Sequence, residues 1–238
     1  MEISGKKALV FGGTSGIGAG IASAFIQAGA HVTVTGVTEQ EVSLISTTLP
    51  GVNAQVLDVR DAAAVKHLLS GFSSLDHVVN CAGIIRRAEE LEPEVFTEVV
   101  DINLNGSMRV NAAARELLAD AKGTITNTAS MLSYFGGGLV PAYAASKGGV
   151  VQMTKSLAIA YAADGIRVNA VAPGWIDTPL TKALQEDTSR NEAILGRTPM
   201  KRWGNPEDVA NGVLYLASPL AGFVTGIVLP IDGGYLCV

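Results

Sequence analysis

The sequence predicts an α/β fold in which helices cover both faces of a parallel β-sheet. Short apolar segments rich in β-branched residues alternate with longer segments that carry an apolar stripe at helical spacing. The composition agrees: 48% of the 238 residues are hydrophobic and 16% are charged, below the ~25% of an average soluble domain. Such a balance suits strands that are buried on both faces, as they are in a parallel sheet.

Seven segments are expected to form the strands. The first, KALVF, is a short apolar run, and the second, HVTVT, is rich in β-branched residues. The expected strands cover residues 7–11, 31–35, 54–59, 77–81, 124–129, 167–172 and 226–231. Strands that alternate with helices pair in parallel through right-handed crossovers, so the seven strands are expected to form one doubly wound sheet.

The expected helices fill the gaps between these strands. In the first, apolar residues at helical spacing form one stripe, made of Ile17, Ile21, Ala24, Phe25 and Ala28. The clearest helical segments cover residues 16–29, 93–119, 142–163 and 206–217. No linker, repeat or low-complexity segment interrupts the alternation, so residues 1–238 are expected to form a single domain.

One long segment, from Trp175 to about Asn205, shows neither strand nor helix signals and follows the sixth expected strand. Irregular segments of this length are usually functional or mobile. We therefore expect residues 175–205 to form a lid that closes over a substrate.

Charge and cysteine content narrow the classes of function. The net charge is −5 without a cluster of lysine or arginine, so no nucleic-acid partner is expected. No apolar run is long enough to cross a bilayer, and Met1–Lys7 lacks the apolar stretch of a signal peptide, so we expect a cytoplasmic protein without a membrane partner. Two cysteines give no disulfide framework, and the three histidines lack metal-ligand spacing, so no metal is expected.

A glycine-rich turn joins the first strand to the first helix. Glycine permits a tight turn and lets the backbone approach a pyrophosphate, which the N–H groups and dipole of the helix N-terminus then bind. This context predicts a Rossmann-type dinucleotide-binding fold, although an ordinary turn remains the alternative because the spacing is G-x-x-x-G-x-G. The residues expected at the cofactor are Gly12, Thr14, Ser15, Gly16, Ile17 and Gly18.

The end of the second strand bears on the choice of cofactor. An acidic residue there binds the adenosine ribose hydroxyls of NAD, whereas a basic one accommodates the 2′-phosphate of NADP. This sequence has Thr35-Gly36-Val37-Thr38, with neither type, and Glu39 comes slightly late. Because Ser15 adds no basic side chain in the glycine turn, we expect NAD(H), with NADP(H) left open.

Tyr143 and Lys147 are the strongest catalytic candidates. Four residues apart in an expected helix, they lie on one face, one turn apart. A lysine ammonium favours the phenolate and lowers a tyrosine pKa that is normally ~10, so the pair can exchange a proton with an alcohol or ketone. With Ser130 upstream and the nucleotide-binding turn, the pair predicts hydride transfer. The alternatives are a surface tyrosine and lysine, and a serine that only caps the next segment.

Together these residues resemble the short-chain dehydrogenase/reductase family over essentially the whole chain. The glycine turn matches, although Phe11 stands where the family usually has threonine, and Asn80–Gly83 matches its Asn-Asn-Ala-Gly motif with Cys81 in place of the second asparagine. The resemblance implies a seven-stranded sheet of order 3-2-1-4-5-6-7 and a homotetramer. It implies the catalytic set Asn103, Ser130, Tyr143 and Lys147.

The resemblance also implies roles for single residues. Asn103 would hold a water that connects Lys147 to solvent, unless it is a turn residue. Asp58 would lie near the adenine, unless it caps the following helix. The further cofactor residues implied are Asp58, Val59, Asn80, Ala82, Gly83, Tyr143, Lys147, Pro173, Gly174, Ile176 and Thr178.

A narrower resemblance links the chain to the 2-deoxy-D-gluconate 3-dehydrogenase and 2-dehydro-3-deoxy-D-gluconate 5-dehydrogenase group. It lies in residues 80–87, 129–133, 194–199 and 202–204, and it implies a sugar-acid substrate and mostly NAD(H). Arginines can bind a carboxylate with two hydrogen bonds, and the alternative for each is a solvated or subunit-contact arginine. The candidates for the substrate are Arg86, Arg87 and Arg202.

The sequence therefore predicts an oxidoreductase that moves hydride between a nicotinamide cofactor and a secondary alcohol or ketone of a sugar acid or related polyol. Two other enzymes share these motifs, a 3-oxoacyl-carrier-protein reductase and a general carbonyl reductase. The carrier-protein enzyme would need a basic patch for its acidic partner and usually prefers NADPH. A binding or regulatory protein that keeps the fold without chemistry is the third alternative.

Overall fold

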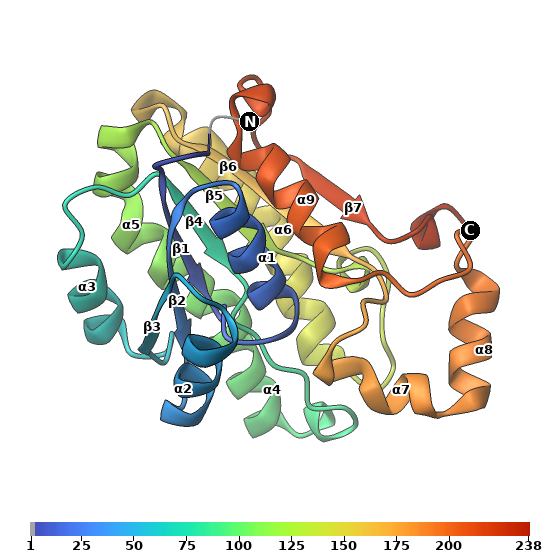
Figure 1. The fold of residues 1–238 in the computed structure, drawn as a ribbon. Coiled ribbons are helices and arrows are strands. Elements are labelled where there is room, and N and C mark those ends of the chain that lie inside the picture. Colours follow the sequence, from blue (N-terminus) through green and yellow to red (C-terminus); the bar gives the residue numbers. More distant parts are fainter. Residues whose placement is uncertain (1–2) are drawn as a thin grey trace.

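The computed structural model describes residues 3–238 and contains one seven-stranded parallel sheet of order β3-β2-β1-β4-β5-β6-β7 (Figure 1). The predicted α/β fold and strand order are confirmed. The first two residues of the N-terminal segment considered for a signal peptide lie outside the described residues. The strands are β1 (Lys7–Phe11), β2 (His31–Gly36), β3 (Val52–Val56), β4 (His77–Asn80), β5 (Thr124–Thr128), β6 (Arg167–Pro173) and β7 (Val228–Ile231).

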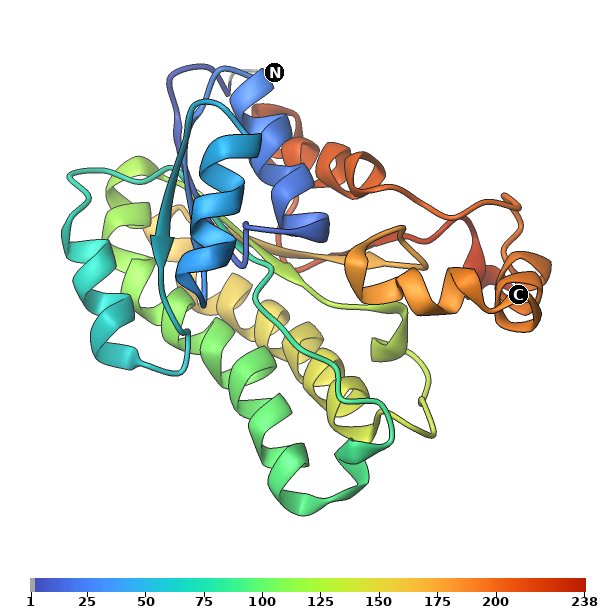
Figure 2. The same ribbon diagram turned by 60° about the horizontal axis from the view of Figure 1, so that its bottom comes forward.

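Helices pack on both faces of the sheet because alternate residues of each inner strand point to opposite sides. Ala8 and Val10 of β1 pack with α1, α2 and α9, whereas Leu9 and Phe11 pack with α3, α5 and α6 (Figure 2). The helices are α1 (Gly16–Gln27), α2 (Glu39–Thr48), α3 (Ala62–Ser70), α4 (Pro93–Val100), α5 (Ser107–Ala121), α6 (Pro141–Tyr161), α7 (Lys182–Glu186), α8 (Thr188–Arg197) and α9 (Pro206–Ala217).

The strand order reverses at β1, which pairs with β2 on one side and β4 on the other. The chain first winds toward β3 and then returns to continue through β4 toward β7. At such a switch point the loops that follow the two central strands separate, and ligands bind between them at the carboxyl ends of the strands.

The helix expected over residues 93–119 is interrupted. α4 ends at Val100, the short element η2 (Asp101–Gly106) is a π-helical turn, and α5 begins at Ser107. The sequence did not indicate the interruption because a π-turn changes the hydrogen bonding of a helix without breaking its apolar stripe. π-turns occur often at functional sites, and this one carries Asn103.

Two other expectations need correction. The third strand is β3 (Val52–Val56) rather than residues 54–59, because it is a half-exposed edge strand with a weak apolar signal. The segment 175–205 is not irregular, since it holds α7 and α8. Only Ile194 of these two helices is buried, so no apolar stripe marked them in the sequence.

Candidate active site

The glycine turn has the geometry that a pyrophosphate site needs. Gly12 and Gly16 have φ angles of 72° and 50°, which glycine adopts readily. A Cβ at Gly12 would lie 2.5 Å from the backbone nitrogen of Ala82, and one at Gly18 would collide with the carbonyl oxygen of Gly12. α1 then begins after Ser15 without a side-chain cap and without an acid in its first turn. Its N–H groups are therefore available to an anion.

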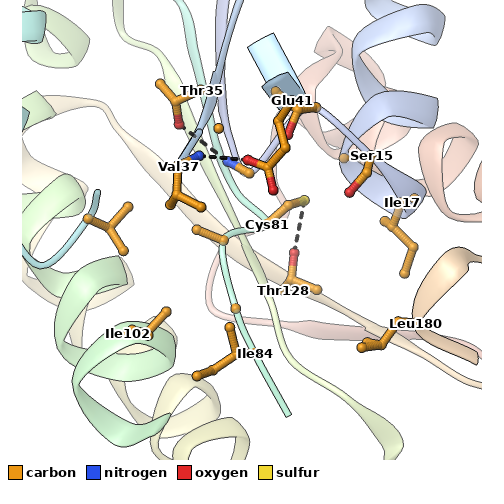
Figure 3. Close-up of a pocket in the computed structure, with 18 of the residues that line it drawn as sticks. Ser15, Ile17, Thr35, Val37, Glu41, Cys81, Ile84, Ile102, Thr128 and Leu180 are labelled. Atoms are coloured by element: carbon orange, nitrogen blue, oxygen red, sulfur yellow. Dashed lines mark hydrogen bonds between the residues drawn. The ribbon is translucent and has the colours of Figure 1, made fainter. Parts of the chain in front are cut away.

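A cavity of about 440 Å³ opens at this turn and runs along the carboxyl ends of the central strands (Figure 3). It brings together most of the residues predicted to contact a cofactor. These are Gly12, Thr14, Ser15, Gly16, Ile17, Gly18, Asp58, Val59, Ala82, Gly83, Tyr143, Lys147 and Thr178. A long cavity with a backbone cradle at its middle fits an extended dinucleotide.

Four predicted cofactor residues do not line this cavity. Asn80 is buried, and its side-chain amide donates to the amide oxygens of Asn111 and Asn127 at 2.7 and 2.9 Å, so it joins β4 to its neighbours. Pro173 ends β6, and the N–H of Gly174 donates to the carbonyl of Ile231. The fourth is Ile176, which is buried and forms a bridge to Gly204. Each is held by protein contacts behind the cavity.

The catalytic candidates meet at the end of the cavity near β5 and α6. Tyr143 and Lys147 lie one turn apart on α6, with the lysine Nζ 5.5 Å from the centre of the tyrosine ring. The Ser130 side chain lies near enough to Tyr143 to lower its pKa, and its hydroxyl oxygen accepts the backbone N–H of Leu132 at 3.2 Å. The Lys147 Nζ donates to the backbone carbonyl of Thr128 at 2.7 Å. This hydrogen bond holds the ammonium at the carboxyl end of β5. The predicted grouping of serine, tyrosine and lysine is therefore present.

Burial governs the charge states of this group. It lowers the pKa of Lys147 to about 8. It raises the pKa of Tyr143, which the Ser130 hydrogen bond lowers and the charge of Glu90 raises. This direction is opposite to the expectation that Lys147 lowers the tyrosine pKa. In the protein alone, the phenol is held as the neutral form because its loss of solvent outweighs other effects.

Asn103 lies in the π-turn with its side chain fully buried. Its Oδ1 accepts the N–H of Ile84 at 2.8 Å, and its Nδ2 donates to the carbonyl of Ile84 at 2.9 Å and to the Ser146 hydroxyl at 3.2 Å. The amide therefore fixes the chain after β4. A Cβ added at Gly83 would lie 3.2 Å from Asn103 Oδ1 and 3.7 Å from Lys147 Nζ, so this glycine separates the two side chains.

Glu90 is a buried carboxylate that the sequence did not single out. It is 1% exposed, and its two oxygens accept the backbone N–H groups of Arg86 and Tyr143, each at 2.8 Å. Tyr143 lies in the first turn of α6, where N–H groups have no helical partner and favour a negative charge. Glu90 thus joins the loop after β4 to the turn that carries Tyr143. It stands among other acids, Glu89 and Glu92, which hid it in the sequence.

The three candidate substrate arginines have different surroundings. Arg86 lines the main cavity beside the catalytic end, whereas Arg87 is exposed and does not line it. Arg202 pairs with both oxygens of Asp208, at 2.7 and 2.9 Å, and lines a second cavity of about 350 Å³ beside β7. Its guanidinium therefore pairs with the first turn of α9, and Arg202 lies at a different cavity from Arg86.

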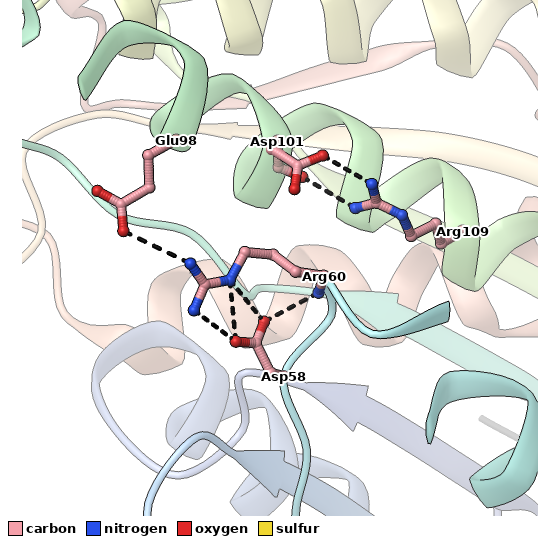
Figure 4. Close-up of polar contacts among 5 residues, drawn as sticks. All are labelled: Asp58, Arg60, Glu98, Asp101 and Arg109. Carbon is pink, nitrogen blue, oxygen red and sulfur yellow. Dashed lines mark hydrogen bonds and ion pairs between the residues drawn. The ribbon is translucent and has the colours of Figure 1, made fainter. Parts of the chain in front are cut away.

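At the other end of the cavity, Asp58 is engaged by Arg60, which the sequence did not single out (Figure 4). The shorter contact, from Nη2 to Oδ2, is 2.6 Å, and the hydrogen bond from Arg60 lowers the pKa of Asp58. Arg60 also lies 3.6 Å from Glu98. Asp58 does not cap α3, because Asp61 does so by accepting the N–H groups of the first turn.

The segment over the cavity is linked to the C-terminus by aromatic contacts. Trp175 and Trp203 pack edge to face with ring centres 5.9 Å apart, and Trp175 also contacts Tyr235 at 6.4 Å. Arg197, at the end of α8, stacks over the Tyr235 ring at 4.3 Å. Leu180, which precedes α7, lines the main cavity. The segment 175–205 therefore lines the cavity through Leu180 and contacts the aromatic group through Trp175, Trp203 and Arg197.

Within residues 3–238, no helix is both long and apolar enough to cross a membrane. The histidine, cysteine and acidic side chains of the same residues form no group of three or more that could hold a metal ion.

Comparisons with known proteins agree with the fold and identify the family. A family model described as enoyl-(acyl carrier protein) reductase matches residues 12–236. A 2-dehydro-3-deoxy-D-gluconate 5-dehydrogenase of Pseudoalteromonas atlantica is 40% identical, over 99% of this chain and 97% of that protein. A 3-oxoacyl-acyl-carrier-protein reductase of Thermotoga maritima is 38% identical, over 98% and 99%.

The structure has close solved neighbours as well. A putative 2-deoxy-D-gluconate 3-dehydrogenase of Agrobacterium tumefaciens, solved with bound NADP, is 40% identical with a TM-score of 0.90. The match covers 99% of this chain and 98% of that one.

Proposed function

The chain belongs to the short-chain dehydrogenase/reductase family, and we propose that it oxidises a secondary hydroxyl of a sugar acid or related polyol with NAD+. One observation carries the proposal: Tyr143 and Lys147 line the same cavity as the glycine turn, and Ser130 lies beside Tyr143. The bound nicotinamide would accept hydride at C4, or donate it in reverse. The names of the relatives support the substrate class.

The residues divide the work on the substrate oxygen. Ser130 donates a hydrogen bond to that oxygen and stabilises charge that develops on it. Tyr143 takes the hydroxyl proton during oxidation and returns it to the ketone during reduction. Its raised pKa keeps the phenol protonated near neutral pH, which favours reduction, and oxidation uses the smaller phenolate fraction. Lys147 binds the nicotinamide ribose and, as an ammonium, stabilises that phenolate.

A proton that reaches Tyr143 needs a route to solvent. We assign Asn103 and Lys147 to this route. A water held at the π-turn that carries Asn103 would connect Lys147 to solvent. The support is the position of Gly83 between the two side chains, where a Cβ would narrow the space beside Asn103 Oδ1. The side-chain amide of Asn103 forms two hydrogen bonds with the backbone of Ile84, and these bonds keep the π-turn rigid.

Arg86 is proposed to bind the substrate carboxylate. Its place at the cavity beside the catalytic end supports this, and Glu90 holds its backbone there. Arg87 serves as the natural comparison, since it is the next residue and lies outside the cavity.

Further proposals concern the protein as a whole. Residues 1–238 act as a single cytoplasmic domain, and the chain assembles into a homotetramer. The segment 175–205, which holds α7 and α8, closes over the substrate as a lid. The exposed faces of these helices and the contact of Leu180 with the cavity support a movable cover.

A 3-oxoacyl-acyl-carrier-protein reductase is the second candidate, since the Thermotoga maritima relative is 38% identical. Its acidic carrier would meet a chain with net charge −5, and Arg60 near the cavity is already paired with acids. Rates with 2-deoxy-D-gluconate and NAD+, compared with an acetoacetyl thioester and either reduced cofactor, separate the two. We expect turnover of the sugar acid; turnover of the thioester alone would contradict the proposal.

A further inference from the structure

The end of β2 lacks an acid in the sequence, yet the structure places a carboxylate there. We propose that Glu41, in the first turn of α2, binds the adenosine ribose hydroxyls of NAD(H) and excludes the 2′-phosphate of NADP(H). The proposal rests on the proposed function only in that the cavity takes a nicotinamide dinucleotide. It assigns the choice between the two cofactors to a residue of α2 whose side chain reaches the end of β2.

Hydrogen bonds fix the position of this carboxylate. Glu41 Oε2 accepts the backbone N–H groups of Val37 and Thr38, at 2.8 and 3.3 Å. In return, the hydroxyl of Thr38 accepts the N–H of Glu41 at 3.2 Å, which completes a capping box. The side chain is thereby folded back from α2 over the end of β2.

Gly36 shows that Glu41 takes the place of a β2 side chain. A Cβ added at Gly36 would lie 2.9 Å from Glu41 Oε2 and 2.7 Å from Cγ2 of Thr14. Both contacts are too short for a real Cβ. The space in which an acid at the end of β2 would begin is therefore filled by the Glu41 carboxylate, and Gly36 is the residue that admits it.

The carboxylate also faces the cofactor cavity. Glu41 lines the cavity with Ser15 and Val37, and Figure 3 shows its carboxylate turned into that space. Among residues 3–238, Oε2 alone carries the hydrogen bonds of this carboxylate, so Oε1 is available to a ligand. An acid beside the glycine turn at the end of β2 is where a dinucleotide presents its adenosine ribose.

The charges around this end favour a ribose without phosphate. A 2′-phosphate would meet the negative charge of Glu41 at close range. Arg60, the basic side chain at the end of β3, is held by Asp58 and Glu98 rather than free to bind it. The solved neighbour from Agrobacterium tumefaciens carries NADP, so the fold itself does not exclude a 2′-phosphate, and its exclusion here falls to local residues such as Glu41.

The test compares Glu41→Gln with Glu39→Gln, which removes the same charge from the same turn of α2. Each protein is titrated with NADH and with NADPH, and binding is followed by nicotinamide fluorescence. The quantity compared is the Kd for NADPH divided by the Kd for NADH. Wild type and Glu39→Gln should bind NADH at least about tenfold more tightly than NADPH. Glu41→Gln should lower this ratio by about tenfold, since glutamine keeps the shape without the charge. An equal ratio in all three proteins would overturn the proposal.

A second measurement needs no variant, in case Glu41→Gln disturbs α2. Wild-type protein is titrated with an NADH analogue that lacks the adenosine 2′-hydroxyl. We expect about tenfold weaker binding than for NADH, because a charged hydrogen bond is lost. Equal binding would overturn the role of Glu41. Neither titration contains a substrate, so a failure here leaves the sugar-acid proposal to its own test, and the reverse also holds.

Discussion

The two ends of the cofactor cavity are built differently. At the catalytic end, Tyr143 and Lys147 come from a single helix, and burial sets their pKa values. At the adenosine end, Glu41, Asp58 and Arg60 come from separate segments and are positioned by caps and ion pairs. In the proposed mechanism, chemistry depends on a fixed spacing within one rigid helix. In the proposal for Glu41, cofactor choice depends on which neighbouring side chain reaches the end of β2. Changes at the two ends should therefore affect turnover and binding separately.

Replacement of Tyr143 by phenylalanine should give the largest effect. The variant keeps the ring but cannot exchange a proton, so kcat should fall by about 1,000-fold. The Kd for NADH, measured by fluorescence titration, should stay within about twofold of wild type, because the adenosine end and the glycine turn are untouched. A kcat near the wild-type value would remove Tyr143 from the mechanism.

Glu90→Gln should separate positioning from chemistry. Glutamine can accept only one of the two N–H groups, so the turn with Tyr143 or the loop with Arg86 is released. We expect kcat to fall by about tenfold or more and the free energy of unfolding to fall by about 2 kcal/mol. The exposed neighbour Glu89→Gln is the control for charge.

A structural role alone would lower stability without a change in the pH profile. The charge of Glu90 raises the pKa of Tyr143, so its removal should lower that pKa. The step near pH 8 that Lys147 sets should stay in place, and the further loss of ketone reduction at higher pH, where Tyr143 is deprotonated, should begin at a lower pH. An unchanged profile in a folded Glu90→Gln protein would limit Glu90 to stability.

Arg86→Ala and Arg87→Ala test how substrate is held at the catalytic end. Loss of a charged hydrogen bond at Arg86 should raise KM for a sugar acid by about tenfold, and loss of Arg87 should change it little. The corresponding sugar alcohol, without a carboxylate, is the matched substrate and should show no difference between the variants. Equal KM values for the acid in all three proteins would exclude a carboxylate site at Arg86.

The pH dependence of reduction should show the smallest effect. Reduction requires protonated Tyr143, whose pKa is raised, and the Lys147 ammonium, whose pKa is about 8. The rate should therefore be level at neutral pH and fall as pH rises through about 8, where Lys147 loses its charge. A rate that stays level to pH 10 would mean that the lysine charge is not needed.

The comparison also explains what could be predicted from the sequence. The alternation of strands and helices, the glycine turn and the spacing of Tyr143 and Lys147 are local patterns, and the structure contains all three. The predicted direction of the shift in the Tyr143 pKa was wrong, because the shift depends on burial, and elements distant in the sequence create that burial. The pair of Asp58 and Arg60 was missed because these residues are only two positions apart and nothing local marks their side chains as facing a cavity.

Acids were the hardest residues to interpret. Glu90 lies within a run of acidic residues, and its burial comes from packing against α6, 53 positions further along the chain. In the sequence, Glu41 looks like an ordinary residue of a capping box. Its carboxylate can lie at the cavity only because Gly36 has no side chain. The helices α7 and α8 were missed because they bury only Ile194, so their sequences lack an apolar stripe.

The most direct test of the account is the initial rate of reduced-nicotinamide formation with 2-deoxy-D-gluconate, measured with NAD+ and with NADP+. Tyr143→Phe serves as the blank for each cofactor. We predict a rate that disappears in the blank and a kcat/KM at least about tenfold higher for NAD+. An equal or higher kcat/KM for NADP+ would contradict the assignment of cofactor choice to the adenosine end, and a rate that survives in the blank would contradict the assignment of chemistry to the catalytic end.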